Sequence, residues 1–167
     1  MMPSMRQWLG ASALIFLLAA GACARGAANT SFNGWWQLDE GASTGVPPMM
    51  KGHQTVVHLT QADERFTIDF LFDGQSVNTS DFVLDGQMHQ GQLGATQDAQ
   101  WVDRPRTIAI DIHRPAGGPM PAGNEHLVWA LQGNGQEIRR TSTHPDTTAP
   151  AQVYLYRRIP PPAGSDR

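Results

Sequence analysis

The chain has 167 residues, 16% charged side chains and a formal net charge of −3 at pH 7. It contains no basic run, so composition gives no electrostatic reason to expect binding to nucleic acid or to anionic lipid. Its single cysteine, Cys23, excludes an internal disulfide, and the domain that follows it lacks the thiolate that a nucleophilic or thiolate-metal site would need.

The first 22 residues predict a secretory signal peptide. Arg6 adds a positive charge to the α-amino group, and residues 8–20 are apolar or small. A positive start, an apolar region of about 7–15 residues and small residues at its end are typical of such a signal. A membrane span would need about 20 apolar residues. The small residues at 20–22 fit the Ala-x-Ala rule, with cleavage before Cys23.

The segment 17–23 also resembles the lipobox of bacterial lipoproteins, in which the cysteine is lipidated and becomes the mature N-terminus. Ala20 stands where lipoboxes usually carry Leu. The resemblance implies lipid attachment at Cys23 and firm membrane anchoring, because such proteins carry more than one acyl chain. Ala24, rather than Asp, follows the cysteine, which implies transport to the outer membrane, facing the periplasm. Ordinary signal cleavage without lipidation is the alternative.

The rest of the chain divides into a tether, one domain and a tail. Residues 23–31 predict a short lipidated tether, and residues 32–159 are long enough for one domain with its own core. The tail, 160–167, begins with three prolines and has no core-forming residue, so we expect it to be loose.

Short strands follow one another through the domain. The clearest pattern is 65–72, where aromatic and aliphatic residues alternate with polar ones, and it ends at Asp73-Gly74, a two-residue hairpin turn. Residues 107–113 alternate in the same way around three isoleucines. The predicted strands span 32–39, 55–60, 65–72, 77–84, 87–93, 96–102, 107–113, 125–131, 136–143 and 152–159, of which 87–93 has the weakest pattern.

These patterns predict an all-β fold. No segment after the leader has a helical pattern, and tight turns separate the strands at regular intervals. So many strands are too many for a flat open sheet in a domain this small. We therefore expect an antiparallel up-and-down meander closed as a barrel of about 8–10 strands.

The two ends of the domain resemble the lipocalin arrangement. The first strand carries Gly34-x-Trp36, and the last carries Arg157 and Arg158. In lipocalins a tryptophan so placed packs under an arginine of the last strand, so the resemblance implies that Trp36 and Arg157 or Arg158 close the barrel floor by a cation–π contact. A Leu-Asp-Gly turn at 84–86 and a Val-Tyr-Leu-Tyr-Arg strand at 153–157 extend the resemblance, to small bacterial lipocalin-like envelope lipoproteins, over residues 32–158.

Successive loops of a meander alternate between the two ends of a barrel. If 87–93 is a strand, the long loops 41–53, 115–124 and 144–150 should therefore share one end, with both chain ends at the other. We expect an open mouth that faces away from the membrane. Its candidate lining residues are Met49, Met50 and Met120, whose adaptable side chains suit an apolar ligand. The alternative is that these methionines cap the core.

The polar residues form no catalytic or metal motif. None of the histidines has a His-x-x-x-His spacing, and Gly-x-Ser-x-Gly is absent. Four polar residues on predicted strands fall out of phase with the apolar positions, which predicts an outer face; they are His58, Asp111, His113 and His126. The sequence therefore predicts a non-enzymatic protein without metal or cofactor.

The leading hypothesis is a membrane-anchored envelope lipoprotein whose barrel binds a small apolar or amphipathic ligand. Two alternatives stay open: a protein-binding envelope module of the inhibitor or immunity type, and a structural lipoprotein without a ligand. A lipid binder needs a cavity, whereas the large side chains of 66–72 indicate a filled interior, which favours protein binding.

Overall fold

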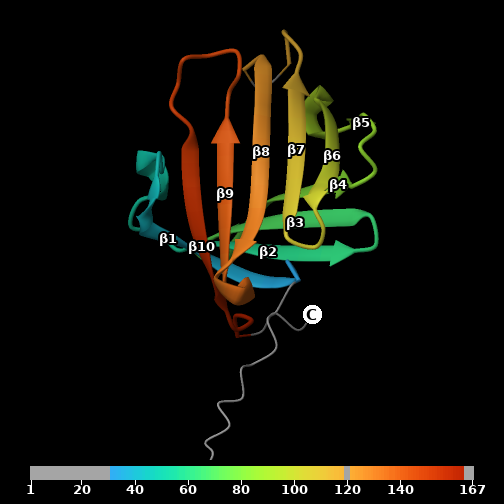
Figure 1. Ribbon diagram of the computed structural model, residues 1–167. Helices are drawn as coiled ribbons and strands as arrows, with labels where there is room; N and C mark the ends of the chain where they lie inside the picture. Colours follow the sequence, from blue (N-terminus) through green and yellow to red (C-terminus); the bar gives the residue numbers. More distant parts are fainter. Residues whose placement is uncertain (1–30, 119–120, 164–167) are drawn as a thin grey trace, which may run out of the picture.

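A computed structural model of the protein describes residues 31–118 and 121–163. Within these ranges the chain forms one ten-stranded sheet in the order β4-β3-β2-β1-β10-β9-β8-β7-β6-β5. Every hydrogen-bonded pair of strands is antiparallel. Figure 1 shows β2 and β3 crossing the long strands β7–β10 at a steep angle, so that the sheet curls into a barrel. The predicted all-β antiparallel meander is thus confirmed.

The strands are β1 (Gly34–Thr44), β2 (Thr55–Ala62), β3 (Arg65–Phe72), β4 (Gln75–Val83), β5 (His89–Gln90), β6 (Thr96–Asp103), β7 (Thr107–Arg114), β8 (Gly123–Gln132), β9 (Glu137–Thr143) and β10 (Gln152–Ile159). Three short 3₁₀ helices lie in the loops: η1 (Pro48–Met50), η2 (Gln92–Gly94) and η3 (Gly133–Gly135). No helix in the described part of the chain is long and apolar enough to cross a membrane.

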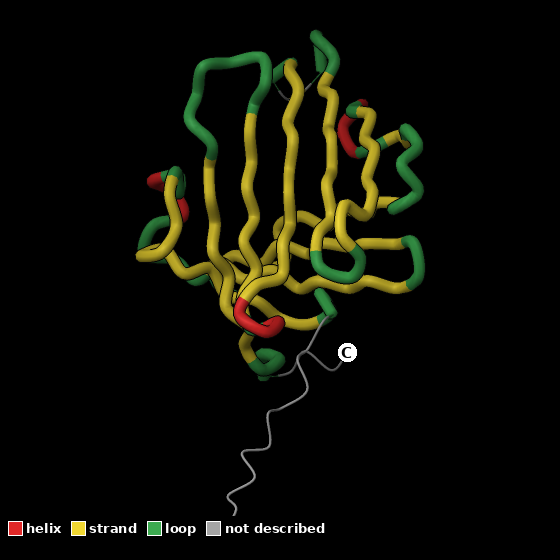
Figure 2. Tube along the Cα trace, in the orientation of Figure 1, coloured by secondary structure: helices red, strands yellow, loops and turns green. Residues whose placement is uncertain are grey.

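Antiparallel pairing of consecutive strands sorts the connections between two ends (Figure 2). The long loops after β1, β7 and β9 share one end, which we call the open end. The turns after β2, β6 and β8 share the other end, which we call the floor. Trp35, near the start of β1, pairs with Ile159 at the end of β10, so both ends of the domain lie at the floor. The expected sorting of long and short loops is confirmed.

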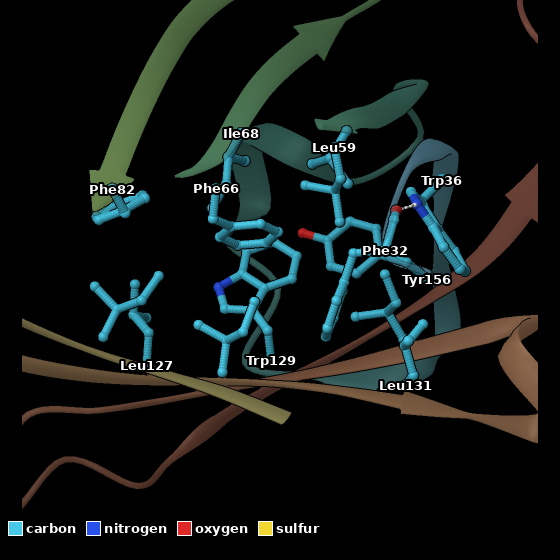
Figure 3. Packing of buried hydrophobic residues seen from close by; sticks show 14 of the residues in the cluster. Phe32, Trp36, Leu59, Phe66, Ile68, Phe82, Leu127, Trp129, Leu131 and Tyr156 are labelled. Atoms are coloured by element: carbon cyan, nitrogen blue, oxygen red, sulfur yellow. Dashed lines mark hydrogen bonds between the residues drawn. The ribbon is translucent and has the colours of Figure 1, made fainter. Parts of the chain in front are cut away.

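Large apolar side chains pack against one another in the interior of the barrel (Figure 3). Strand alternation brings one face of each strand inward, and the buried residues of the described chain include seven aromatic side chains, six of them on strands. Phe32 packs edge-on against Phe66 at 5.5 Å between ring centroids. The indole Nε1 of Trp36 donates a 2.8 Å hydrogen bond to the Phe32 carbonyl, so this buried donor is satisfied. The largest fully buried side chains are Trp36, Trp129, Tyr156, Phe32 and Phe66.

The backbone hydrogen bonding of the barrel is interrupted between β4 and β6. The two strands are bridged by side chains: Gln97 Nε2 donates to the Asp81 carbonyl at 2.7 Å, and Gln92 Nε2 donates to the Thr79 carbonyl. Nearer the floor, Gly86 N donates to the Ala99 carbonyl at 2.9 Å. We call this side-chain-bridged junction of β4 with β6 the seam; the barrel is nearly, not fully, closed.

The predicted strand 87–93 is wrong in extent. Only His89–Gln90 pairs as a strand, and η2 follows at once. Leu93 has a left-handed φ of 55°, and Gly94 has a φ of 79°. Because a strand needs extended backbone, these conformations end it.

Candidate ligand-binding site

The floor is closed by Trp36 of β1 and Arg158 of β10. The central carbon of the Arg158 guanidinium lies 4.0 Å from the centroid of the Trp36 ring. The same guanidinium donates hydrogen bonds to the carbonyls of Ser31 and Asn33, both at 2.7 Å, and of Gly135 at 3.0 Å. One side chain therefore joins the start of the domain, its last strand and η3.

Arg157, the other candidate for this floor contact, lies on the outer face. It pairs with Asp39 at 2.8 Å and with Glu137 at 3.3 Å, and its side chain is 58% exposed. The expectation of Arg157 under Trp36 is thus corrected to Arg158. The reason is strand alternation: Tyr156 and Arg158 share the inward face, and Arg157 between them points outward.

The outer face carries the polar residues that were out of phase in the sequence. His126 Nδ1 lies 2.7 Å from Asp111 Oδ1, and His113 Nδ1 lies 2.6 Å from Asn124 Oδ1. His58 stacks on Trp35, with ring centroids 4.2 Å apart. Among the described residues no group of three or more His, Cys, Asp or Glu side chains could hold a metal ion.

A cavity of about 610 Å³ lies at the open end. Its outer lining is apolar and includes Met49, which is 76% exposed, and Val77, which is 63% exposed. Met50 lines the same cavity and packs against the core. The structure therefore brings two of the three candidate methionines to one cavity. Met120 lies outside the described residues, as does Cys23.

The rim of the cavity is held by a contact between the β1–β2 loop and the β3–β4 turn. His53 Nδ1 lies 2.8 Å from Asp73 Oδ2, and Gln54 N donates to Asp73 Oδ1 at 2.9 Å. The hydrogen bond with His53 is the main cause that lowers the pKa of Asp73. The His53 ring also lies against Phe72, at 4.7 Å between centroids, so the rim combines apolar and ionic contacts.

A polar cluster lies above the core, on the inward faces of β7, β8 and β9. Arg114 Nη2 donates to Glu125 Oε2 at 2.5 Å, and Ser142 Oγ donates to Glu125 Oε1 at 2.8 Å. Arg140 Nη2 lies 3.6 Å from the same Oε1. Burial alone would raise the pKa of Glu125. The hydrogen bonds from Arg114 and Ser142, with the charge of Arg140, outweigh it and lower the pKa below its ordinary value.

Arg140 links this cluster to the cavity, which it lines together with Thr55 and Tyr154. Its guanidinium carbon lies 5.7 Å from the Trp129 ring centroid and 5.2 Å from that of Tyr154. In the described chain the buried Nε of Arg140 has no hydrogen-bond partner. A buried N–H of a cation without an acceptor is costly, so this atom is available to an acceptor group of a ligand.

The hydroxyl of Tyr156 shares this environment. Burial raises the pKa of Tyr156 to about 12, and the nearby Arg140 charge offsets part of that effect. The two groups lie near each other but do not meet hydrogen-bond geometry, so the Tyr156 hydroxyl is also left without a partner in the part of the chain described. The wall behind the cavity therefore holds two polar groups, Arg140 Nε and the Tyr156 hydroxyl, that have no hydrogen-bond partner among the described residues.

A second cavity, of about 320 Å³, lies at the seam. Arg114 lines it together with Gln92 and Gln97, which bridge the seam, and with apolar residues such as Ile112. Glu125 already engages Arg114 through a charge-assisted hydrogen bond. Arg114 would therefore attract an anionic ligand in this cavity more weakly than Arg140 would in the first one.

Sequence reasoning missed the polar cluster, although a signal for it exists. Arg114 follows Ile112 by two positions, Glu125 precedes Leu127 by two, and Arg140 follows Ile138 by two. Each charge is therefore in phase with the apolar face of its own strand, which places it inside the barrel.

No protein-family profile matches this chain, and no curated protein matches it. Solved structures do. A REP1-NXSQ fatty acid transporter is 12% identical, with a TM-score of 0.54, over 78% of this chain and 97% of the other. A Schistosoma mansoni fatty acid binding protein in complex with arachidonic acid is 14% identical, with a TM-score of 0.54, over 80% and 99%. Fatty-acid-binding protein 1 of Echinococcus granulosus is 10% identical, with a TM-score of 0.52, over 77% and 97%. At these identities the similarity shows a shared barrel fold.

Proposed function

We propose that this protein binds a small amphipathic ligand with an acidic head group, of the fatty-acid type, in the open-end cavity. The observation that carries the proposal is the unpartnered Nε of Arg140 beside a cavity whose lining is mostly apolar. Similarity in fold to fatty-acid-binding proteins supports the ligand class.

Burial along the cavity gives the ligand a direction. Met49 and Val77 at the rim are exposed, whereas Thr55 and Tyr154 at the inner side are buried. An alkyl chain gains about 0.8 kcal/mol for each CH₂ group that it buries against such a surface. The head would lie inward, where a carboxylate can accept from Arg140, and the tail would lie against the methionines at the rim.

We further propose that the barrel is anchored in a bacterial envelope through a lipidated Cys23, as the lipobox-like leader implies. Ser31, the first described residue, contacts Arg158 at the floor. An anchor joined to the floor by a short tether would hold the barrel near the membrane with its open end facing away.

Native mass spectrometry tests the ligand proposal. The full chain with Cys23→Ser, which cannot be acylated at that position, is purified without detergent and then mixed with dodecanoate. We expect a discrete adduct that organic extraction removes. Arg140→Gln should weaken dodecanoate binding at least about tenfold, whereas Arg139→Gln, on the exposed outer face of the same strand, should not. A bare mass for the parent protein at saturating dodecanoate would overturn the proposal and favour a protein partner.

A further inference from the structure

We infer that Glu125 sets the charge of the head group that the cavity accepts, admitting a single negative charge and excluding a dianion. Glu125 is thereby a specificity-determining residue rather than only a structural one. The inference rests on the proposed function, because it concerns the head group of the same ligand.

The first step is the charge of the polar cluster. It holds two cations, Arg114 and Arg140, and one anion, Glu125. Of these three residues Arg140 lines the cavity, and Glu125 acts on it from behind through Arg140. The other titratable side chains of the lining are Tyr154, whose pKa is raised by burial, and His53, which is paired with Asp73 at the rim. The cluster therefore has one positive charge more than it has negative charges.

The second step is the distribution of that charge. Glu125 lies between the two arginines and engages them unequally, at 2.5 Å to Arg114 and 3.6 Å to Arg140. Arg114 is thus neutralised within the protein, and Arg140 keeps a buried N–H without an acceptor. A single ligand carboxylate would supply an acceptor for that N–H and balance the remaining positive charge.

The third step is the cost of a second negative charge. A phosphate monoester at pH 8 carries close to two negative charges, since its second pKa is about 6. Only one positive charge in the cluster is uncompensated, so the extra charge would face the carboxylate of Glu125 where solvent screens poorly. Repulsion between like charges is strong at such a poorly screened place, so a dianion should bind more weakly than a monoanion with the same tail.

Replacing Glu125 by Gln tests the effect of its negative charge separately from the effect of its size. The amide has nearly the same volume; its oxygen can still accept the hydrogen bond from Arg114, and its NH2 group can donate to the Ser142 hydroxyl. The substitution converts a cluster with one excess positive charge into a cluster with two. It should therefore favour a dianionic head over a monoanionic one without changing the space available to the alkyl chain.

The experiment compares two probes with the same alkyl chain, dodecanoate and dodecyl phosphate, at pH 8. Their affinities are measured by isothermal titration calorimetry on the full chain with Cys23→Ser. We expect the parent protein to prefer dodecanoate, and Glu125→Gln to shift the ratio of the two affinities at least about tenfold toward dodecyl phosphate. Glu137→Gln, which removes an outer-face carboxylate paired with Arg157, should leave the ratio unchanged.

A double substitution provides a second test if Glu125→Gln alone folds poorly. Arg114→Gln combined with Glu125→Gln restores one excess positive charge and should restore the preference for dodecanoate. An unchanged ratio in Glu125→Gln, or a double variant that still favours dodecyl phosphate, would overturn the inference. Failure of the parent protein to bind either probe would instead overturn the proposed function.

Discussion

Arg158 covers the inner tryptophan of a Trp-Trp pair, with its guanidinium carbon 4.0 Å from the Trp36 ring centroid, and its three hydrogen bonds hold the chain on either side of that ring. A cation over an indole is stabilised by the ring's negative face, and more strongly when both are shielded from water. The floor is therefore a defined structural part of the barrel, and substitutions in it can be tested separately from those in the ligand site.

Truncation of the floor arginine should destabilise the barrel. Arg158→Ala removes the contact with Trp36 and leaves three carbonyls without their donor, so we expect the free energy of unfolding to fall by about 2–4 kcal/mol. Arg157→Ala removes only exposed ion pairs and should cost at most about 1 kcal/mol. Urea unfolding followed by tryptophan fluorescence measures both. Equal losses in the two variants would contradict the assignment of the floor contact to Arg158.

Gly34 is expected to tolerate no side chain. Its φ is +132°, and a Cβ atom there would lie 2.7 Å from Arg158 Nη1. Gly34→Ala should therefore cost about 1–3 kcal/mol of stability through strain and displacement of the guanidinium. Gly41→Ala on the same strand meets only an ordinary contact of 3.6 Å with Asp39 and should be close to neutral. The same unfolding assay distinguishes them, and a neutral Gly34→Ala would show that the floor can rearrange.

Two carboxyl groups should have opposite effects on stability at acid pH. The pKa of Glu125 is lowered in the folded protein, so its contribution is present above the unfolded value of about 4.3 and is lost as the pH falls through the folded value. Burial raises the pKa of Asp98, with a further rise from Asp111, so Asp98 favours the folded state at low pH and this contribution is lost as the pH rises through its folded value. Between about pH 3 and 6, Glu125→Gln should flatten the acid-side fall in stability, and Asp98→Asn should steepen it. Urea unfolding at several pH values gives both slopes, and slopes that change in the same direction would contradict these assignments.

The side chains that bridge the seam should control its local opening. Gln97→Ala removes the hydrogen bond to the Asp81 carbonyl, so we expect amide hydrogen exchange in β4 and β6 to become at least about fivefold faster. Exchange in β1 and β10 should not change, because backbone pairing holds those strands. Gln100→Ala, an exposed position on β6, is the matched control. Acceleration spread evenly over all strands would indicate global destabilisation instead.

Met49 should contribute to binding of the alkyl chain and not to stability. Its side chain lines the cavity but is largely exposed, so Met49→Ser should leave the free energy of unfolding within about 0.5 kcal/mol of the parent value. Affinity for hexadecanoate should fall about two- to fivefold, while affinity for octanoate, whose shorter tail does not extend to the rim, should stay the same. Met88→Ser, at a similarly exposed methionine that does not line this cavity, serves as the control.

The sequence predicted the strands where both the pattern and the turn were strong. Residues 65–72 alternate cleanly and end at Asp73-Gly74, and β3 (Arg65–Phe72) has those bounds. Residues 87–93 have no apolar face and contain Gly91, so nothing held the whole segment in extended form. The floor tryptophan was identified, but its partner was not, because adjacent arginines cannot be told apart until the register of β10 against β1 is known.

Prediction of the polar cluster from the sequence depends on the strand register even more than prediction of the floor contact does. Each of its charges is in phase with the apolar face of one strand, which the sequence alone could have revealed. That Ile112 pairs with Glu125 and Trp129 with Arg140 is a property of strand pairing across separate hairpins. Only that pairing brings two cations and one carboxylate within contact of one another.

The seam is the junction at which we expect the barrel to deform most easily. In a barrel closed by backbone hydrogen bonds all round, strand number and stagger fix the circumference. Here one junction is bridged by glutamine side chains, which are longer and have more rotatable bonds than a backbone pair. We therefore expect the interior to widen first at that line, since this leaves the backbone pairing of the other strands intact. The backbone hydrogen bond from Gly86 to Ala99 joins the two sides of the seam at the floor, so we expect widening to be smallest there.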